Sequence, residues 1–428
     1  MKPSLIPALS LLVIVHPSFF LLAQGPLTPP GAPAQTMKSL DQVEARMAID
    51  PAQPGFALPF TISQPGSYYF TANVTATGSI AGIIIAADDV SLDLNGFALT
   101  GGGTGSARGI DVPAARKNLA IRNGTIRGWT AGGVRAENAT NSTLEGLRFT
   151  GNAGGSLVGA LVVGNGSVIK DCVASNNTTN GIKTFSGTTI IGCTAASNSF
   201  SGFFLGGSVT ITDCTAHANS GGGIKLVGNG LINHCTASFN TGSGIAGGVG
   251  STINNCAASF NGFSGIEADN GSTVSHCAVT NNSSSGIVAA FGGTVSDCTA
   301  TINTGHGIST GDGSSIHNCT ARSNTQTGIQ VTSACHVFTN TCDSNATGIG
   351  VGVSGGASGD RNRIDGNSCS RNQIGISIYG LSNFTVRNHA GGNTTQGYSI
   401  SGALLNKTGP IVTDNGVITS NSPWANFE

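Results

Sequence analysis

Apolar and polar residues follow one pattern of 21 residues that recurs along the middle of the chain without a change in spacing. Each unit has an apolar residue three positions before a Cys and a small residue two positions after it. Asn follows five positions after the Cys, and Gly and an apolar residue follow after nine and ten positions. The cysteines that mark these units are Cys172, Cys193, Cys214, Cys235, Cys256, Cys277, Cys298 and Cys319. A fixed period with the same apolar positions predicts a solenoid, in which each unit packs against its neighbours.

The units predict short β-strands, because β-branched residues occupy the apolar positions and Gly interrupts every unit. Helical repeats need about 33 residues or more, which is longer than this period. The Asn position supports strands joined by tight bends, since Asn tolerates a left-handed backbone and stacked amides can hydrogen-bond between coils. The Asn residues are Asn177, Asn198, Asn219, Asn240, Asn261, Asn282, Asn303 and Asn324, continued by Asn345, Asn372 and Asn393.

Four sequence features together resemble the right-handed parallel β-helix family, which has the pectate-lyase-like fold and includes exported bacterial proteins. They are GIIIAADDVSLDLNGFALTG (82–101), IRNGTIRGW (121–129), the Cys-Thr-Ala…Asn…Gly-Ile units and the ending GPIVTDNGVITSNSPWANFE (409–428). The resemblance implies an all-β, right-handed parallel β-helix solenoid. The family includes lyases, glycoside hydrolases, epimerases and adhesins, so the resemblance leaves the activity open.

Four segments are expected along the chain. Residues 1–24, with an interrupted apolar run, are expected to be a signal peptide, and residues 25–38 a Pro-rich linker. Residues 39–55 should form an N-terminal cap helix over Ser39–Met47 and a lead-in, because Ser and Gln fit a capping box ahead of an apolar face. Residues 56–428 should form about 14 coils, mostly of 21 residues, with a C-terminal cap.

The composition narrows the function classes. Only 9% of the residues are charged, against about 25% in an ordinary soluble domain, and the net charge is −1. A dedicated nucleic-acid binder is normally basic, so we expect no nucleic acid as partner. The leader predicts a secreted, periplasmic or cell-surface protein with no transmembrane helix after cleavage, and we expect a monomer.

The first candidate site is the column of residues that precede the cysteines. Strand alternation places this column on the outer face. Asp213 would then lie beside His234, and His276 beside Asp297, about 5 Å apart on adjacent coils. Such pairs can bind a cation or sugar hydroxyls, and the alternative is a solvated ladder of mixed charge that avoids like-charge contacts.

The second candidate site is the coil between Asn340 and Asn367, which is six residues longer than the standard coil. Its charged residues are Asp360, Arg361, Arg363 and Asp365. Insertions in solenoids form loops, and loops often carry function. Resemblance to β-helix lyases implies that Asp360 and Asp365 would hold Ca²⁺ and that Arg361 or Arg363 would be the base. A surface loop of salt bridges is the alternative.

The coils ahead of the cysteines are locally basic, with an excess of +4, which would attract an acidic polysaccharide. The alternative is scattered solubilising charge. The basic residues are Arg108, Arg116, Lys117, Arg122, Arg127, Arg135 and Arg148, against Asp111, Glu137 and Glu145.

The regular cysteines are expected to be buried thiols that act as small apolar fillers. Neighbouring Cβ vectors in register run parallel about 4.8 Å apart, whereas a disulfide needs Cβ atoms near 3.8 Å, so no disulfide is expected. Titration after denaturation without reductant checks this, and fewer than about eight free thiols would contradict it.

Three functions remain open from the sequence. The first is a protein that binds, and in an enzymatic version processes, a polysaccharide or cell-surface glycan along its parallel face. The second is a non-catalytic structural or adhesive surface rod, and the third an accessory periplasmic protein in metal-enzyme maturation. If the protein is an enzyme, its resemblance to this family implies a polysaccharide lyase or glycoside hydrolase. The sequence contains no coherent set of catalytic residues for either reaction. Exposed aromatic platforms would favour the first function over the second.

Overall fold

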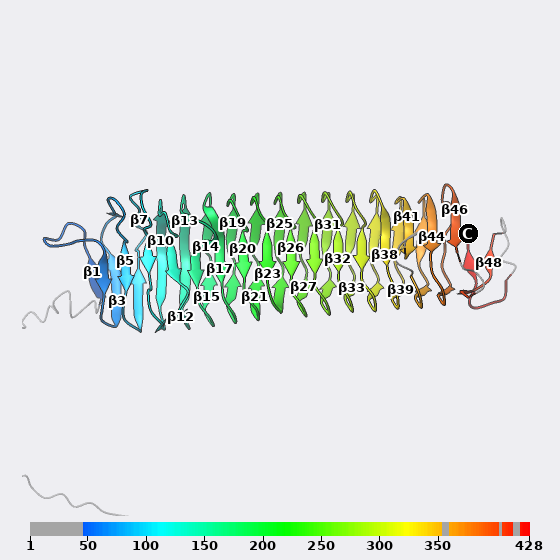
Figure 1. Ribbon diagram of the computed structural model, residues 1–428, viewed down its shortest axis with the longest axis horizontal. Helices are drawn as coiled ribbons and strands as arrows, with labels where there is room; N and C mark the ends of the chain where they lie inside the picture. The colour runs from blue at the N-terminus through cyan, green and yellow to red at the C-terminus, as the bar shows by residue number, and fades with distance from the viewer. Residues whose placement is uncertain (1–45, 353–358, 402–404, 414–419) are drawn as a thin grey trace, which may run out of the picture. The chain divides into compact units, whose positions relative to one another are not determined.

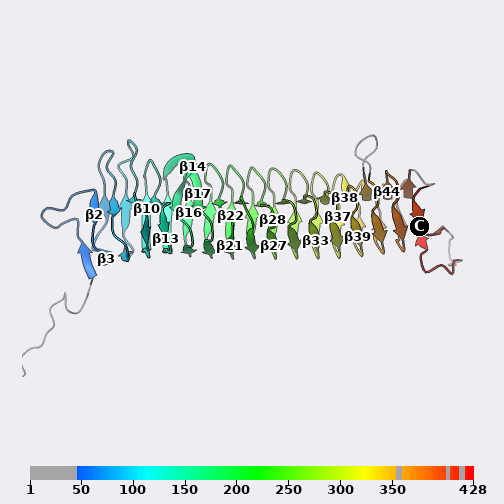
Figure 2. The ribbon, with the colours of Figure 1, turned by 60° about the horizontal axis from the view of Figure 1, so that its bottom comes forward.

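The computed structural model describes residues 46–352, 359–401, 405–413 and 420–428, which belong to one compact unit. These residues form a parallel β-solenoid whose coils stack along one axis (Figure 1). Each coil contributes strands to three stacks, in which every strand pairs in parallel with the equivalent strands of the next and previous coils. Figure 2 shows strands of the first stack, such as β21 and β27, beside β22 and β28 of the second.

The first stack contains β1 (Arg46–Ile49), β3 (Gly66–Phe70), β6 (Val90–Asp93), β10 (Ala120–Arg127), β13 (Thr143–Thr150), β15 (Val168–Lys170), β18 (Thr189–Ile191), β21 (Val209–Thr212), β24 (Gly230–Asn233), β27 (Thr252–Asn254), β30 (Thr273–Ser275), β33 (Thr294–Ser296), β36 (Ser315–His317), β39 (His336–Phe338), β42 (Arg363–Asp365), β45 (Phe384–Val386) and β47 (Lys407–Thr408).

The second stack contains β4 (Val74–Thr75), β7 (Ala98–Thr100), the second halves of β10 and β13, β16 (Val173–Ser175), β19 (Thr194–Ala196), β22 (Thr215–His217), β25 (Thr236–Ser238), β28 (Ala257–Ser259), β31 (Ala278–Thr280), β34 (Thr299–Thr301), β37 (Thr320–Arg322), β40 (Thr341–Asp343) and β43 (Ser368–Ser370).

The third stack contains β2 (Phe60–Ile62), β5 (Ile83–Ile85), β8 (Ile110–Asp111), β11 (Val134–Ala136), β14 (Ala153–Val163), β17 (Thr178–Thr184), β20 (Phe203–Leu205), β23 (Ile224–Leu226), β26 (Ile245–Gly247), β29 (Ile266–Ala268), β32 (Ile287–Ala289), β35 (Ile308–Thr310), β38 (Thr327–Val331), β41 (Thr347–Val351), β44 (Ile374–Ile378) and β46 (Gln396–Ile400). Two short pairs complete the described strands: β9 (Arg116–Lys117) with β12 (Ala139–Thr140), and β48 (Ile411–Val412) with β49 (Asn426–Phe427).

The all-β solenoid is confirmed, but the number of coils and the N-terminal cap differ from the predictions. The structure has about 17 coils rather than about 14, because the irregular coils at both ends were undercounted. The part of the predicted helix Ser39–Met47 that the structure describes, Arg46 and Met47, lies in β1, so the solenoid begins before residue 56. The rest of this helix, the predicted signal peptide and the predicted linker lie outside the described residues.

Two tight bends join the three strands of a regular coil, and both use a left-handed residue followed by a buried one. At the first bend Asp213, with φ of 55°, precedes the buried Cys214. At the second bend Ala218, with φ of 52°, precedes the buried Asn219. The cysteine and asparagine columns are therefore the inner corners of the coil, and the residues before them are its outer corners.

All eleven cysteines of the chain are buried free thiols, which confirms the predicted burial. Each regular thiol lies near the backbone carbonyl two residues earlier, as in Cys214 Sγ to Thr212 O at 3.1 Å. In the coil after Cys319, Asn340 occupies the equivalent corner, and its Oδ1 accepts the Cys319 backbone N–H at 2.9 Å. Cys and Asn thus fill the same inner corner. The absence of disulfides in solution stays a prediction.

The second inner corner carries a continuous column of side-chain amides, from Asn152 to Asn393, which we call the Asn ladder. Asn240 is typical: its Nδ2 donates to Asn261 Oδ1 at 3.1 Å and to the carbonyl of Ala216 at 3.1 Å. Its backbone N–H also donates to Asn261 Oδ1, at 3.1 Å. The predicted rung-to-rung amide bonds are therefore present, and they satisfy buried backbone groups at every bend.

His306 is expected to make the solenoid sensitive to mild acid. Burial lowers the pKa of His306, whose Nδ1 accepts the Thr327 backbone N–H at 3.3 Å. The neutral imidazole is therefore favoured in the folded state, and its stabilising contribution is lost as pH falls below about 6.5 through the lowered pKa. His306→Ser copies Ser285, one coil earlier, whose hydroxyl accepts the backbone N–H of His306 at 3.3 Å. Melting curves at pH 7.5 and 5 should show a smaller loss for the variant than for the wild type, and equal losses would contradict the expectation.

Candidate functional site

The predicted outer column before the cysteines is confirmed as an exposed column, and its residue types follow from the bend. Asp213, His234, His276 and Asp297 have φ between 49° and 55°. Asn, Asp and His tolerate this left-handed region better than other non-glycine residues. The backbone alone therefore accounts for the polar character of the column.

The structure brings one of the two predicted pairs together. His234 Nδ1 lies 3.9 Å from Asp213 Oδ1, with both side chains more than half exposed. His276 instead has its Nδ1 3.3 Å from Asn254 Oδ1, and Asp297 Oδ1 accepts a hydrogen bond from Asn318 Nδ2 at 3.2 Å. This column is a mixed, hydrogen-bonded, exposed polar surface.

A better candidate lies on the outer face of the first stack over β39, β42, β45 and β47, which we call the C-terminal groove. The register aligns His336, Arg363, Phe384 and Lys407 in one outward column. Two hollows of about 540 and 460 Å³ occupy this face. The first is lined by His336, Phe338 and Arg363, with Asp365 and Arg387, and the second by Phe384, Lys407 and Trp424, among others.

Two arginines in the groove are held by one buried carboxylate. The Asp365 side chain is 6% exposed and contacts Arg363 Nη2 at 2.7 Å and Arg387 Nη2 at 2.5 Å. Burial alone would raise the pKa of Asp365, but hydrogen bonds and charge from Arg387 and Arg363 hold the pKa below its usual value. Both arginine side chains remain about half exposed. One fixed carboxylate thus orients two cations toward solvent.

Aromatic rings surround these cations. The Arg363 guanidinium carbon lies 5.3 Å from the centre of the Phe384 ring, and that of Arg387 lies 5.6 Å from the centre of the Trp424 ring. The His336 and Phe338 rings stack with centres 4.2 Å apart. Burial, and then the charge of Arg363, lower the pKa of His336, so the imidazole is neutral at neutral pH. The groove therefore combines fixed cations, ring faces and a neutral imidazole.

Of the four charged residues predicted in the long coil, two enter the groove. Arg363 and Asp365 pair with each other on β42. Asp360 Oδ1 accepts the backbone N–H of Leu381 at 2.7 Å, and Arg361 occupies a left-handed bend with φ of 57°. Among the described residues no group of three or more His, Cys, Asp or Glu side chains is arranged to hold a metal ion. The Ca²⁺ role implied for Asp360 and Asp365 stays a hypothesis.

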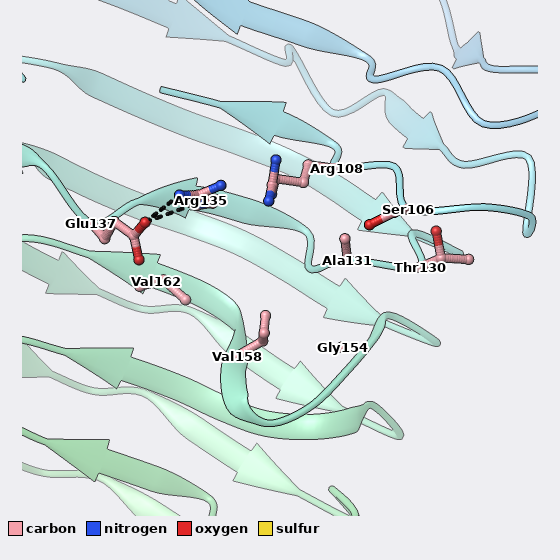
Figure 3. Close-up of a pocket in the computed structure, with 9 residues that line it drawn as sticks. All are labelled: Ser106, Arg108, Thr130, Ala131, Arg135, Glu137, Gly154, Val158 and Val162. Atoms are coloured by element: carbon pink, nitrogen blue, oxygen red, sulfur yellow. Dashed lines mark hydrogen bonds and ion pairs between the residues drawn. The ribbon is translucent and has the colours of Figure 1, made fainter. Parts of the chain in front are cut away.

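A third hollow, of about 390 Å³, lies on the third stack in the basic early coils (Figure 3). Arg135 pairs with Glu137, two residues later on the same side of this hollow, and Arg108 pairs with Asp111 at 3.4 Å. Gly154 and Val158, in the long β14, form its other wall. Each arginine has its own carboxylate here, so the hollow carries little net charge. Arg122 lies on β10 in the first stack, and Arg148 lies on β13 in the second stack, so neither lines this hollow.

The family model described as "Right handed beta helix region" matches residues 71–208, 108–247, 185–317 and 227–357, which together span more than half of the chain. The chain belongs to the right-handed β-helix family. No curated protein matches the sequence. Within the described part of this β-helix no helix is long and apolar enough to span a membrane.

Solved structures with a similar fold include the A-module of mannuronan C-5 epimerase AlgE4 from Azotobacter vinelandii. It is 15% identical with a TM-score of 0.45, over 75% of this chain and 91% of that chain. The periplasmic alginate epimerase AlgG is 13% identical with a TM-score of 0.40, over 67% and 72%. PfbA, a surface adhesin of Streptococcus pneumoniae, is 10% identical with a TM-score of 0.31, over 64% and 82%.

Sequence reasoning found Arg363 and Asp365 but missed the residues that complete the groove of this β-helix. His336, Phe384 and Lys407 occupy the same outward column as Arg363, at separations of 27, 21 and 23 residues. Aligning the irregular C-terminal coils position by position would have shown this column. Trp424 could not be found in this way, because it follows the last regular coil.

Proposed function

We propose that this protein is an extracytoplasmic β-helix that binds an acidic polysaccharide in the C-terminal groove. The observation that carries the proposal is the pair of exposed guanidinium groups of Arg363 and Arg387, oriented by the buried Asp365 and stacked on aromatic rings. Arginine forks match the geometry of carboxylates, and ring faces pack against the apolar faces of sugars. A uronate residue presents both groups.

The charge balance of the groove supports a negatively charged ligand. Arg363, Arg387 and Lys407 contribute three positive charges, and Asp365 contributes one negative charge. The whole chain has a net charge of −1, so this excess is a local property of the face. Because the hollows lie on successive coils of one parallel stack, the site suits an extended chain rather than a compact ligand.

The test is binding of polygalacturonate to the intact protein at low and high salt. Wild type should bind, and binding should weaken as ionic strength rises, since exposed charges are screened. Arg387→Ala and Lys407→Ala should each weaken binding about tenfold, which corresponds to about 1.4 kcal/mol. Arg148→Ala removes the same charge from a distant exposed position and should bind as wild type.

Arg387→Ala could also weaken folding, since it leaves the buried Asp365 with one partner fewer. Lys407→Ala removes a charge without this risk, because the Lys407 side chain is exposed and pairs with no buried carboxylate among the described residues. Absence of polygalacturonate binding by a folded wild type would refute the proposal, as would equal losses in Lys407→Ala and Arg148→Ala. Release of unsaturated uronate, measured with and without Ca²⁺, separates processing of the polymer from binding alone.

A further inference from the structure

The second bend of each regular coil places one residue in the left-handed region, and three of these residues are large, apolar and exposed. Most positions of this column carry small or polar residues, such as Asn176, Ser197, Asn281 and Ser323. The exceptions are Phe239 with φ of 58°, Phe260 with φ of 55° and Ile302 with φ of 56°. Left-handed backbone is unfavourable for bulky or β-branched residues, so these three positions are strained.

Burial does not compensate this strain. Phe239 is 55% exposed, Phe260 is 50% exposed and Ile302 is 57% exposed. Phe263, in the same turn as Phe260, is 60% exposed. Backbone strain and exposed apolar surface at the same positions indicate a role other than folding.

The rings of His217, Phe239 and Phe260 contact one another in a row along the solenoid axis. Phe239 and Phe260 stack with ring centres 4.9 Å apart and planes inclined by 6°. His217, one coil earlier, meets Phe239 edge-on with centres 5.4 Å apart. His217 is the last residue of β22, and Phe239 and Phe260 directly follow β25 and β28, which belong to three successive coils. The three rings therefore form an edge rather than a pocket.

The size of this edge argues against a protein partner. A side chain of this size that is half exposed offers about 100 Å² of surface. Phe239, Phe260, Phe263 and Ile302 together therefore offer roughly 400 Å², about half of the ~800 Å² that each partner buries in a standard protein interface.

The surroundings supply hydroxyl groups. The residue before each left-handed position is Ser238, Ser259, Thr280 or Thr301 in four successive coils. Ser238 Oγ lies 3.1 Å from His217 Nδ1, and Thr301 Oγ1 donates to Thr280 Oγ1 at 3.1 Å. Asp, Glu, Lys and Arg are absent from both columns over these coils. Half-exposed aromatic rings beside neutral hydroxyls match a ligand with an apolar face and hydroxyl edges.

We propose that the edge formed by His217, Phe239 and Phe260 is a second binding surface, for the apolar face of an uncharged, extended chain of pyranose sugars. This second surface extends the proposed function of polysaccharide binding. It is separate from the C-terminal groove and needs no carboxylate on the ligand. Apolar contact is not screened by salt, so binding here should be insensitive to ionic strength.

The test is calorimetric titration of the full chain with cellohexaose, an uncharged extended oligosaccharide. Phe239→Asn/Phe260→Asn, which copies Asn176 and Asn281 of the same column, should weaken binding at least tenfold. Its melting temperature should stay level or rise, because relief of backbone strain offsets the lost stacking. Phe239→Tyr/Phe260→Tyr keeps the rings and should retain binding, and Ser323→Asn, a bend change without a ring, should bind as wild type.

The proposal would be overturned by no cellohexaose binding by wild type, by equal binding by the Asn variant, or by a fall of its melting temperature by more than about 2 °C, which would assign the rings to stability. Self-association of wild type that the Asn variant loses would make the edge a contact between copies and also overturn it. Arg387→Ala should bind cellohexaose normally, so loss of polygalacturonate binding alone concerns the groove and leaves the edge intact.

Discussion

Replacing Asn261 with Ala is expected to lower the free energy of unfolding by about 3–5 kcal/mol, an effect larger than for most single substitutions. Asn261 Oδ1 accepts two hydrogen bonds from Asn240, from its backbone N–H and its Nδ2, both at 3.1 Å. Asn261 Nδ2 donates to Asn282 Oδ1 at 3.0 Å and to the carbonyl of Ala237 at 3.1 Å. The substitution leaves several buried polar groups unpaired at once, and each costs about 1–3 kcal/mol.

Cys256→Ala, in the same coil, is the matched control. Cys256 is equally buried, but its thiol makes only weak contacts, so its loss should cost about 1 kcal/mol. Long repeat arrays do not always unfold in one step, so urea unfolding should be combined with amide hydrogen exchange in the coils on either side. Similar losses of stability for the two variants would show that the Asn ladder is not the main support of the bend.

Replacing Gly223 with Ala is expected to destabilise the protein by about 2–3 kcal/mol. A Cβ at Gly223 would lie 2.5 Å from the Gly244 carbonyl oxygen and 2.7 Å from Asn240 Nδ2. The backbone of one coil and the Asn ladder of the next are therefore in direct contact with this glycine. Added volume there must displace either a carbonyl or a ladder amide.

The neighbouring Gly222 provides the control, because a Cβ there would meet only the Ser243 carbonyl oxygen, at 3.2 Å. Ser201 and Ser243 occupy the equivalent position in adjacent coils, so Gly222→Ser should change stability by less than about 0.5 kcal/mol. Urea unfolding of both variants checks the contrast. A Gly222→Ser loss as large as that of Gly223→Ala would mean that the close approach at Gly223 is not the cause.

Much of the fold could be predicted because each coil repeats the same local choices. The Cys, Asn and Gly-apolar positions of a unit such as Cys214–Ile224 correspond to an inner corner, a second inner corner and a buried strand. Prediction failed at the ends, where coil length varies. Met47 shows why: its helical pattern is overridden by parallel pairing of β1 with β3.

The candidate site was harder to predict than the fold. Arg363 and Asp365 were found by their charge and by the length of their coil, whereas His336 and Arg387 were not. Asp213 and His234 were predicted to be neighbours correctly, yet their polar character follows from the left-handed bend. At such a bend the left-handed backbone limits the residue type, so an Asp or His there is not by itself evidence of a binding site.

By itself, the sequence determined the solenoid, the exposed outer column, the buried cysteines and the Asn ladder, because these depend on interactions between identical positions of neighbouring coils. Only the tertiary structure decided which irregular positions share a surface. The groove joins Arg363 to Trp424, and the edge stacks Phe239 on Phe260 in a strained backbone. Such sites depend on coil length, on φ angles and on the exposure of single side chains, none of which a repeat pattern specifies.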